Sequence, residues 1–167
     1  MHQLMSAICY CYQNRIAHRD LKYENFLLED KNRENLVIKL IDLGGERYFS
    51  KHKKISKMNG NPYCIVPEVL GETYEEKCDV WSAGVIFYIL LCDYPTFNGQ
   101  SDKEIIAAVK NGEFDFPDEE WSLISEERKD LIRKMLTYEP RKLLRATNVL
   151  FIHSLSFLKV KIRVIKK

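Results

Sequence analysis

The sequence predicts a mainly helical α+β domain in which one small β-hairpin lies near the start of the chain. Three observations support this prediction. Apolar residues recur at helical spacing over residues 2–13, two short β-prone runs follow at 26–29 and 36–41, and residues 79–92 carry apolar side chains on every face of a helix. With 167 residues, 46% of them hydrophobic, the chain is most simply one domain with one sizeable core.

The first half of the chain reads as a helix, a hairpin and a loop. In residues 2–13 the helical stripe consists of Leu4, Ile8, Cys11 and Tyr12. The polar turn "DKNREN" joins the two β-prone runs, so they are expected to pair. Residues 44–63 are rich in Gly, Ser, Lys and Asn without periodicity, which predicts a loop; loops this long are often functional.

The second half reads as three helices. Residues 79–92 are apolar on all faces, so this helix is expected to be buried on all sides. Residues 101–112 begin with Ser101 and Glu104, a capping box, and end at Asn-Gly. Ser125 and two following acids open the last helix before a turn that contains a proline. The buried stripe expected for this last helix is Leu131, Ile132, Met135 and Leu136. The proline of the following turn is Pro140.

Composition and charge exclude several classes of protein. The formal net charge of +2 does not favour nucleic acid as a partner, since phosphate-binding surfaces usually show a strong basic excess. The longest apolar run, residues 83–92, is too short to span a bilayer. Five cysteines form no C-x-x-C pair, and an odd number without a secretion signal predicts reduced thiols and a cytoplasmic location.

A cluster of polar residues precedes the predicted hairpin. Asp20, Lys22 and Asn25 lie within six positions, in the stretch "HRDLKYEN". A polar loop in which Asp and Asn serve as turn residues would explain an isolated pair. The pattern H-R-D-L-x-x-x-N fixes five positions, however, and a chain of this length would match it by chance less than about once in 10⁴ trials. The spacing therefore favours a functional loop.

This pattern resembles the catalytic loop of eukaryotic protein kinases. Further landmarks of that family follow in the expected order over residues 1 to about 150, which resemble its C-terminal (large) lobe. The stretches "EKCDVWSAGVIFYILLC" and "KDLIRKMLTYEP" are similar to the calcium-dependent and calmodulin-regulated serine/threonine kinases. Asp42-Leu43-Gly44 stands where the family has D-F-G, and Val66-Pro67-Glu68 stands where it has A-P-E. Asp79 and Trp81 match the family's D-x-W at the start of the buried helix.

The resemblance implies transfer of the ATP γ-phosphate to a Ser or Thr hydroxyl of a protein substrate. Asp20 would accept the proton of that hydroxyl and orient it. Lys22 would place a cation against the transferring phosphoryl group. Asn25 and Asp42 would hold Mg²⁺, which prefers oxygen ligands. Leu27 would form a floor under the adenine.

The resemblance also implies features of substrate and regulation. Glu24 matches an acid that in many relatives contacts an Arg three residues before the phosphorylated position, so a basic R-x-x-S/T substrate is implied. That Glu24 is a plain surface carboxylate is about equally expected. Arg19 would bind an anion on the basic loop, where Ser50 and Ser56 are candidate phosphosites. A solvated loop without phosphate is at least as well supported. Asp79 would hold the backbone of the catalytic loop, although a helix N-cap role fits its position too.

Several positions depart from the family pattern. Leu43 and Val66 are mild changes. Tyr23 stands in place of Pro, and Asn61 replaces a Thr that hydrogen-bonds the catalytic Asp and Lys. The expected Arg partner of Glu68 is replaced by Leu143, with Arg141 and Arg145 nearby.

The sequence contains no G-x-G-x-x-G loop, no V-A-I-K lysine and no D-x-D-x-D-G calcium loop. We therefore expect residues 1–158 to form a partial kinase domain without its small lobe, followed by a basic tail at 159–167. Such a lobe should bind ATP very weakly and turn over little. The alternatives are a non-catalytic binding or regulatory module derived from a truncated kinase, or a nonfunctional product.

Overall fold

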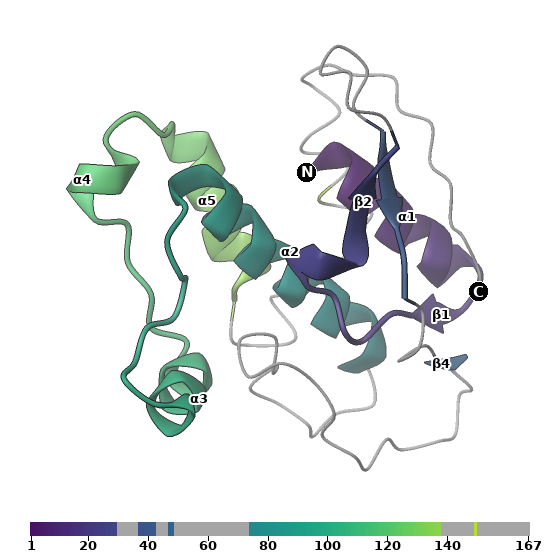
Figure 1. The fold of residues 1–167 in the computed structure, drawn as a ribbon, viewed down its shortest axis with the longest axis horizontal. Helices are drawn as coiled ribbons and strands as arrows, with labels where there is room; N and C mark the ends of the chain where they lie inside the picture. The colour runs from purple at the N-terminus through teal and green to yellow at the C-terminus, as the bar shows by residue number, and fades with distance from the viewer. Residues whose placement is uncertain (30–36, 43–46, 49–73, 138–148, 150–167) are drawn as a thin grey trace.

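Helix α2 runs through the middle of the molecule and joins its two parts (Figure 1). The computed structural model describes residues 1–29, 37–42, 47–48, 74–137 and 149. On one side of α2 lie α1 and the small strands, and on the other lie α3, α4 and α5 (Figure 1). The elements are α1 (His2–Gln13), β1 (Ile16–Ala17), the 3-10 helix η1 (Tyr23–Asn25), β2 (Phe26–Leu28), β3 (Ile38–Leu40), β4 (Arg47–Tyr48), α2 (Tyr74–Cys92), α3 (Asp102–Asn111), α4 (Asp118–Trp121) and α5 (Glu126–Met135).

The predicted helix at 2–13 and the predicted hairpin are confirmed. Strands β2 and β3 pair antiparallel, with Leu27 opposite Lys39. The Lys39 ammonium also lies 3.0 Å from the Glu29 carboxylate across the hairpin. Within the predicted loop at 44–63, Arg47–Tyr48 instead form β4, which pairs with β1. A two-residue strand carries no periodicity, so the sequence could not reveal it; the rest of this loop lies outside the described residues.

Helix α2 forms the centre of the core, and it begins at Tyr74, earlier than predicted. Residues 78–88 are all buried, as expected. The prediction of burial on all sides is wrong for Leu90, which is 69% exposed. The last turn has packing partners on one side only, because Ile89 and Leu91 pack partly against the core while Leu90 does not.

The core on either side of α2 comes from the predicted apolar stripes. From α1 it takes Leu4 and Ile8, and the full stripe predicted for the last helix is buried. Trp81 of α2 stacks on Phe97 at 5.9 Å with 4° between the rings. Beyond it, Tyr88 is surrounded by three further rings that hold the short helix α4 in place. These rings are Phe114, Phe116 and Trp121.

The predicted start and stop signals of α3 are confirmed. The Ser101 hydroxyl accepts a hydrogen bond from the Glu104 N–H at 3.4 Å, and the Glu104 carboxylate accepts one from the Gln100 N–H at 2.8 Å. Gly112 ends the helix with φ 65°, a conformation that suits glycine. Across the described residues, every helix is too short or too polar to cross a bilayer.

Candidate active site

The backbone of the predicted catalytic loop is held by one buried carboxylate. The N–H groups of His18 and Arg19 each donate to a different oxygen of Asp79, both at 2.8 Å. Asp79 is 1% exposed and lies in the second turn of α2, which begins at Tyr74. The N-cap alternative for Asp79 is therefore wrong, and the loop-holding role implied by the resemblance is confirmed.

The surroundings of Asp79 set its protonation. Burial raises the pKa of the Asp79 carboxyl, while hydrogen bonds from the Arg19 and His18 N–H groups, and from the Tyr12 hydroxyl, oppose that rise. The adjacent Cys78 thiol donates to Asp79 Oδ1 at 3.7 Å. Burial holds the pKa of Cys78 well above its ordinary value, so this thiol stays protonated and acts as a donor.

His18 connects the catalytic loop to the end of strand β3. Its ring is 1% exposed. Nδ1 accepts from the Asp20 N–H at 3.4 Å, and Nε2 lies 3.2 Å from the Ile41 carbonyl. Together these contacts require the neutral ring with its hydrogen on Nε2. One imidazole thus fixes Asp20 relative to the residue that precedes Asp42.

Asn25 meets the same carbonyl from the other side. The Asn25 carbonyl accepts from the Ile41 N–H at 2.8 Å, and the Asn25 side-chain amide donates to the Ile41 carbonyl at 3.5 Å. Because its nitrogen faces Ile41, the side-chain oxygen of Asn25 is the atom left to face a cation. Asp42 follows directly and is exposed. The structure therefore brings the two predicted metal ligands together.

Two residues of the site have left-handed backbone conformations. Arg19 has φ 68° and Asp42 has φ 62°, a region that non-glycine residues rarely adopt. Such strain persists only where surrounding contacts impose it, and it gathers at functional sites. Around Arg19 these contacts are the hydrogen bonds of Asp79 with the backbone of the catalytic loop. Before Asp42 they are the contacts of Ile41 with His18 and Asn25.

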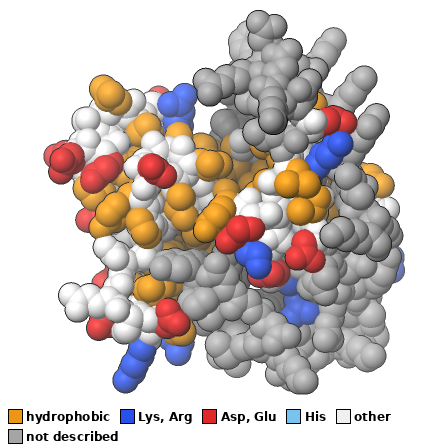
Figure 2. All heavy atoms as spheres, in the orientation of Figure 1, with side chains coloured by type: hydrophobic (Ala, Val, Ile, Leu, Met, Phe, Trp, Pro, Cys, Tyr) orange, Lys and Arg blue, Asp and Glu red, His pale blue; other side chains and the backbone are white. Residues whose placement is uncertain are grey.

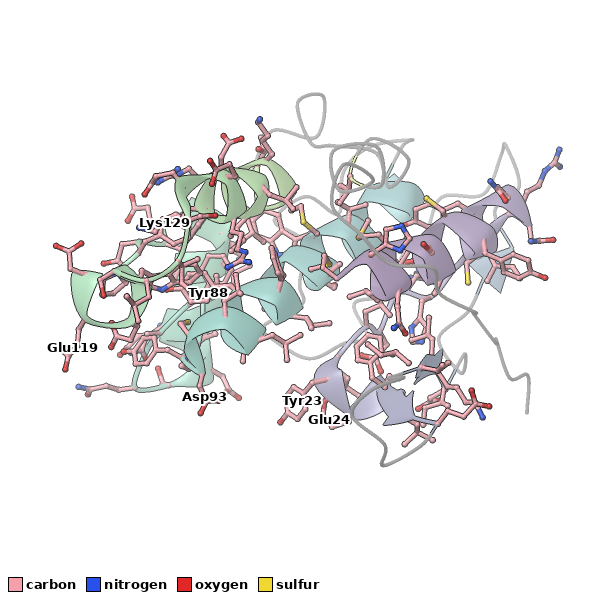
Figure 3. All side chains as sticks on the ribbon, turned by 90° about the horizontal axis from the view of Figure 1, so that it is seen from above. Tyr23, Glu24, Tyr88, Asp93, Glu119 and Lys129 are labelled. Atoms are coloured by element: carbon pink, nitrogen blue, oxygen red, sulfur yellow. The ribbon has the colours of Figure 1, made fainter. Side chains whose placement is uncertain are left out.

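Lys22 and Asp20 form the charged centre of the site. The Lys22 ammonium lies 3.3 Å from the Asp20 carboxylate, and each side chain is 31% exposed. The hydrogen bond with Asp20 and its charge raise the pKa of Lys22, and the charges of Glu24 and Asp42 add to this. Figure 2 shows acidic side chains gathered around a basic one on this face, and Figure 3 shows Glu24 projecting outward from η1.

Leu27 lies beside this group on β2 and is 49% exposed. All five predicted site residues thus lie on one stretch of loop and hairpin. Sequence reasoning missed the Ile41 carbonyl, since a backbone group has no sequence signature, and it read Tyr12 only as part of an apolar stripe. Some predicted features lie outside the described residues: Ser50, Ser56, Asn61, Glu68, Arg141, Leu143, Arg145 and the basic tail.

Comparison with known proteins agrees with this geometry. The protein kinase domain family matches residues 1–153, and the chain belongs to this family. The chain is 47% identical over 151 residues to calcium-dependent protein kinase 3 of Plasmodium berghei (strain Anka), which covers 90% of this chain and 27% of that protein. It is 48% identical over 136 residues to calcium-dependent protein kinase 4 of Plasmodium falciparum (isolate 3D7), covering 81% and 26%. The chain thus spans about a quarter of the length of these relatives.

Proposed function

We propose that this chain is the catalytic lobe of a serine/threonine protein kinase. The observation that carries the proposal is the joining of two separate motifs at the Ile41 carbonyl. His18 links Asp20 to this carbonyl, and Asn25 binds it directly beside Asp42. A module that only binds partners has no physical need for this arrangement of base, cation and oxygen ligands.

The protein's own side chains divide the work of phosphoryl transfer. Asp20 accepts the proton of the substrate hydroxyl and orients its oxygen. Lys22 lies 3.3 Å from the Asp20 carboxylate, so its cation would stand beside the phosphoryl group that the substrate oxygen attacks. Its raised pKa keeps the ammonium charged throughout the physiological range. Positioning and charge neutralisation supply most of the catalysis in this reaction class.

The residues present fit a magnesium–nucleotide complex. Among the described residues, no three of His, Cys, Asp and Glu gather as a metal site. Mg²⁺ bound through phosphates needs only one or two protein carboxylate or amide oxygens, which Asn25 and Asp42 offer. When bound, the ion neutralises the charge of the phosphates. The exposed face of Leu27 offers an apolar surface for the adenine ring.

A basic protein substrate forms the finer part of the proposal. Glu24 is exposed, and its charge acts on Lys22, which pairs with Asp20, so a cation of the substrate could reach Glu24 while the hydroxyl meets Asp20. Glu24→Gln should raise KM for an R-x-x-S peptide about tenfold and leave kcat unchanged. An unchanged KM for the R-x-x-S peptide would assign Glu24 to the solvated surface instead, and an equal rise for a peptide without the Arg would show that Glu24 does not recognise that Arg.

Magnesium-dependent nucleotide binding by residues 1–167 tests the cofactor site. Affinity for ADP is expected to be weak and to rise when Mg²⁺ is added, as measured by NMR titration. Asp42→Asn should remove that rise. Asp93→Asn is a matched control, since Asp93 is also exposed and has φ 55°. Two results would contradict the assignment. One is an ADP affinity that does not change with Mg²⁺, and the other is an Asp93→Asn variant that loses the Mg²⁺ effect as fully as Asp42→Asn does.

Phosphoryl transfer tests the reaction itself. Residues 1–167 alone should show little turnover, and fusion to the small lobe of a calcium-dependent relative should produce activity on Ser and Thr peptides. Asp20→Asn should lower kcat by a factor of about 10² or more while nucleotide affinity is retained. An active fusion that tolerates Asp20→Asn, or that phosphorylates only Tyr peptides, would overturn the proposal.

A further inference from the structure

An exposed aromatic ring lies within the charged part of the candidate active site. Tyr23 is 63% exposed and stands between Lys22 and Glu24 on η1. Consecutive Cα atoms are about 3.8 Å apart, so the Tyr23 ring and the Glu24 carboxylate start from neighbouring points of one short turn. Figure 3 shows both side chains leaving η1 on the same side, outward from the ribbon. A flat apolar ring face and a carboxylate are therefore presented to solvent together.

The turn that carries Tyr23 is held by its buried end. The Asn25 N–H donates to the Lys22 carbonyl at 3.0 Å, which closes η1 around Tyr23. Asn25 is 2% exposed, and its backbone carbonyl accepts from the Ile41 N–H at 2.8 Å. The fold thus sets the direction in which the Tyr23 side chain leaves the backbone. A ring on a fixed backbone has only two side-chain torsions to lose when a ligand stacks on it.

The charges beside this ring suit a cation. The Lys22 ammonium already lies 3.3 Å from the Asp20 carboxylate. Glu24 is exposed, and among the described residues no basic side chain forms an ion pair with it. The face of a Tyr ring also attracts positive charge, because the ring quadrupole is negative there. A cation on the substrate would therefore be attracted by both the carboxylate and the ring.

Elsewhere in this chain, one guanidinium is held by the same pair of groups. The Arg133 guanidinium carbon lies 4.8 Å from the centre of the Phe116 ring, and its Nη1 lies 3.6 Å from the Glu126 carboxylate. The Arg133 side chain is 50% exposed, so the arrangement forms on a surface open to water. A planar guanidinium can stack on a ring and still donate to a carboxylate from its edge, which a compact lysine ammonium does less well.

We propose that Tyr23 is a specificity-determining residue whose ring stacks on a guanidinium of the protein substrate while the edge of that guanidinium meets Glu24. The ring thereby favours Arg over Lys at this substrate position. The consequence for catalysis rests on the proposed function. Binding of the substrate cation itself depends only on the two side chains on η1.

NMR titration of residues 1–167 tests the proposal with two peptides, R-x-x-S and K-x-x-S, that are otherwise identical. The wild type should bind the Arg peptide more tightly, and the Hδ protons of the peptide Arg should move upfield because they lie over an aromatic ring. Tyr23→Leu should abolish this shift and weaken binding of the Arg peptide about two- to fivefold, the range expected for one exposed cation–π contact. Tyr23→Phe keeps the ring face and should keep both the shift and the preference.

Tyr10→Leu is the matched control, because Tyr10 is 53% exposed on α1 and its loss should change neither peptide's binding. No Hδ shift of the Arg peptide with the wild type would overturn the proposal, and so would an unchanged Arg preference in Tyr23→Leu. Equal weakening of both peptides by Tyr23→Leu would also overturn it, since that result means a nonspecific apolar contact.

These outcomes are separate from those of the phosphoryl-transfer experiment. A fusion that is active on Ser peptides and keeps its Arg preference in Tyr23→Leu would refute the role of Tyr23 and leave the proposed function standing. An inactive fusion would refute the proposed function, while the ring-dependent Hδ shift in residues 1–167 would still support the role of Tyr23 in binding.

Discussion

Gly84 lies where α2 packs against the end of α5, and its replacement by Ala tests how tightly the central helix is packed. A Cβ atom at Gly84 would lie 3.0 Å from Leu136 Cδ2 and 3.0 Å from Met135 Cβ. Both neighbours are buried, with exposed fractions of 2% and 0%. The Leu136 methyl is the end of a flexible side chain, but Met135 Cβ is fixed to the backbone of its helix.

Two opposing effects decide the result of Gly84→Ala. Ala is favoured over Gly inside a helix by about 1 kcal/mol. Overpacking of a closed core costs about 1–3 kcal/mol. Because Met135 Cβ cannot move without its helix, we expect overpacking to prevail and the free energy of unfolding to fall by about 1 kcal/mol. This corresponds to roughly 2–4 °C in Tm for a chain of this size.

Urea unfolding of residues 1–167, followed by circular dichroism, measures the change. Leu136→Ala is the matched second variant, since it removes one of the two contacts. Gly84→Ala should cost less in the Leu136→Ala background, with a coupling of at least about 0.5 kcal/mol. A more stable Gly84→Ala protein would refute the proposed clash, and additive effects of the two substitutions would place the clash at Met135 Cβ alone.

Three further predictions concern α2. Asp79→Ala leaves one buried and one part-buried backbone N–H group without their acceptor and should lower the free energy of unfolding by about 2–5 kcal/mol. An unchanged Tm would contradict this role. Burial raises the pKa of Tyr88 to about 12, so the stability that this group contributes is present below pH 10 and is lost as pH rises through 12. Tyr88→Phe should remove a step near pH 12 from the absorbance titration at 295 nm. Loss of a step near pH 10 would contradict the raised pKa. Asp93 has φ 55° and an acidic charge at the C-terminal end of α2, so Asp93→Gly should raise Tm by a few degrees. An unchanged or lower Tm would contradict this prediction.

The sequence by itself determined the local elements and the chemistry of the site. Helix caps such as Ser101 and Gly112 act within one turn, and cross-strand pairing in the hairpin spans a short connection, so neighbouring residues encode both. The predicted site residues Asp20, Lys22 and Asn25 lie within six positions of one another, so their spacing alone was informative. The family comparison agrees with what this spacing indicated.

Contacts between distant parts of the chain were decided by the tertiary structure. From the sequence alone, Asp79 could serve as a helix N-cap or as the acceptor that holds the catalytic loop. The fold places it within α2, 61 residues beyond His18, where its carboxylate accepts hydrogen bonds from the loop backbone. It also exposes Leu90, which its apolar neighbours had predicted to be buried. In each case the outcome depends on which surface of α2 faces which neighbouring element. Local periodicity does not encode this orientation, because it is determined by packing against elements that are distant in the sequence.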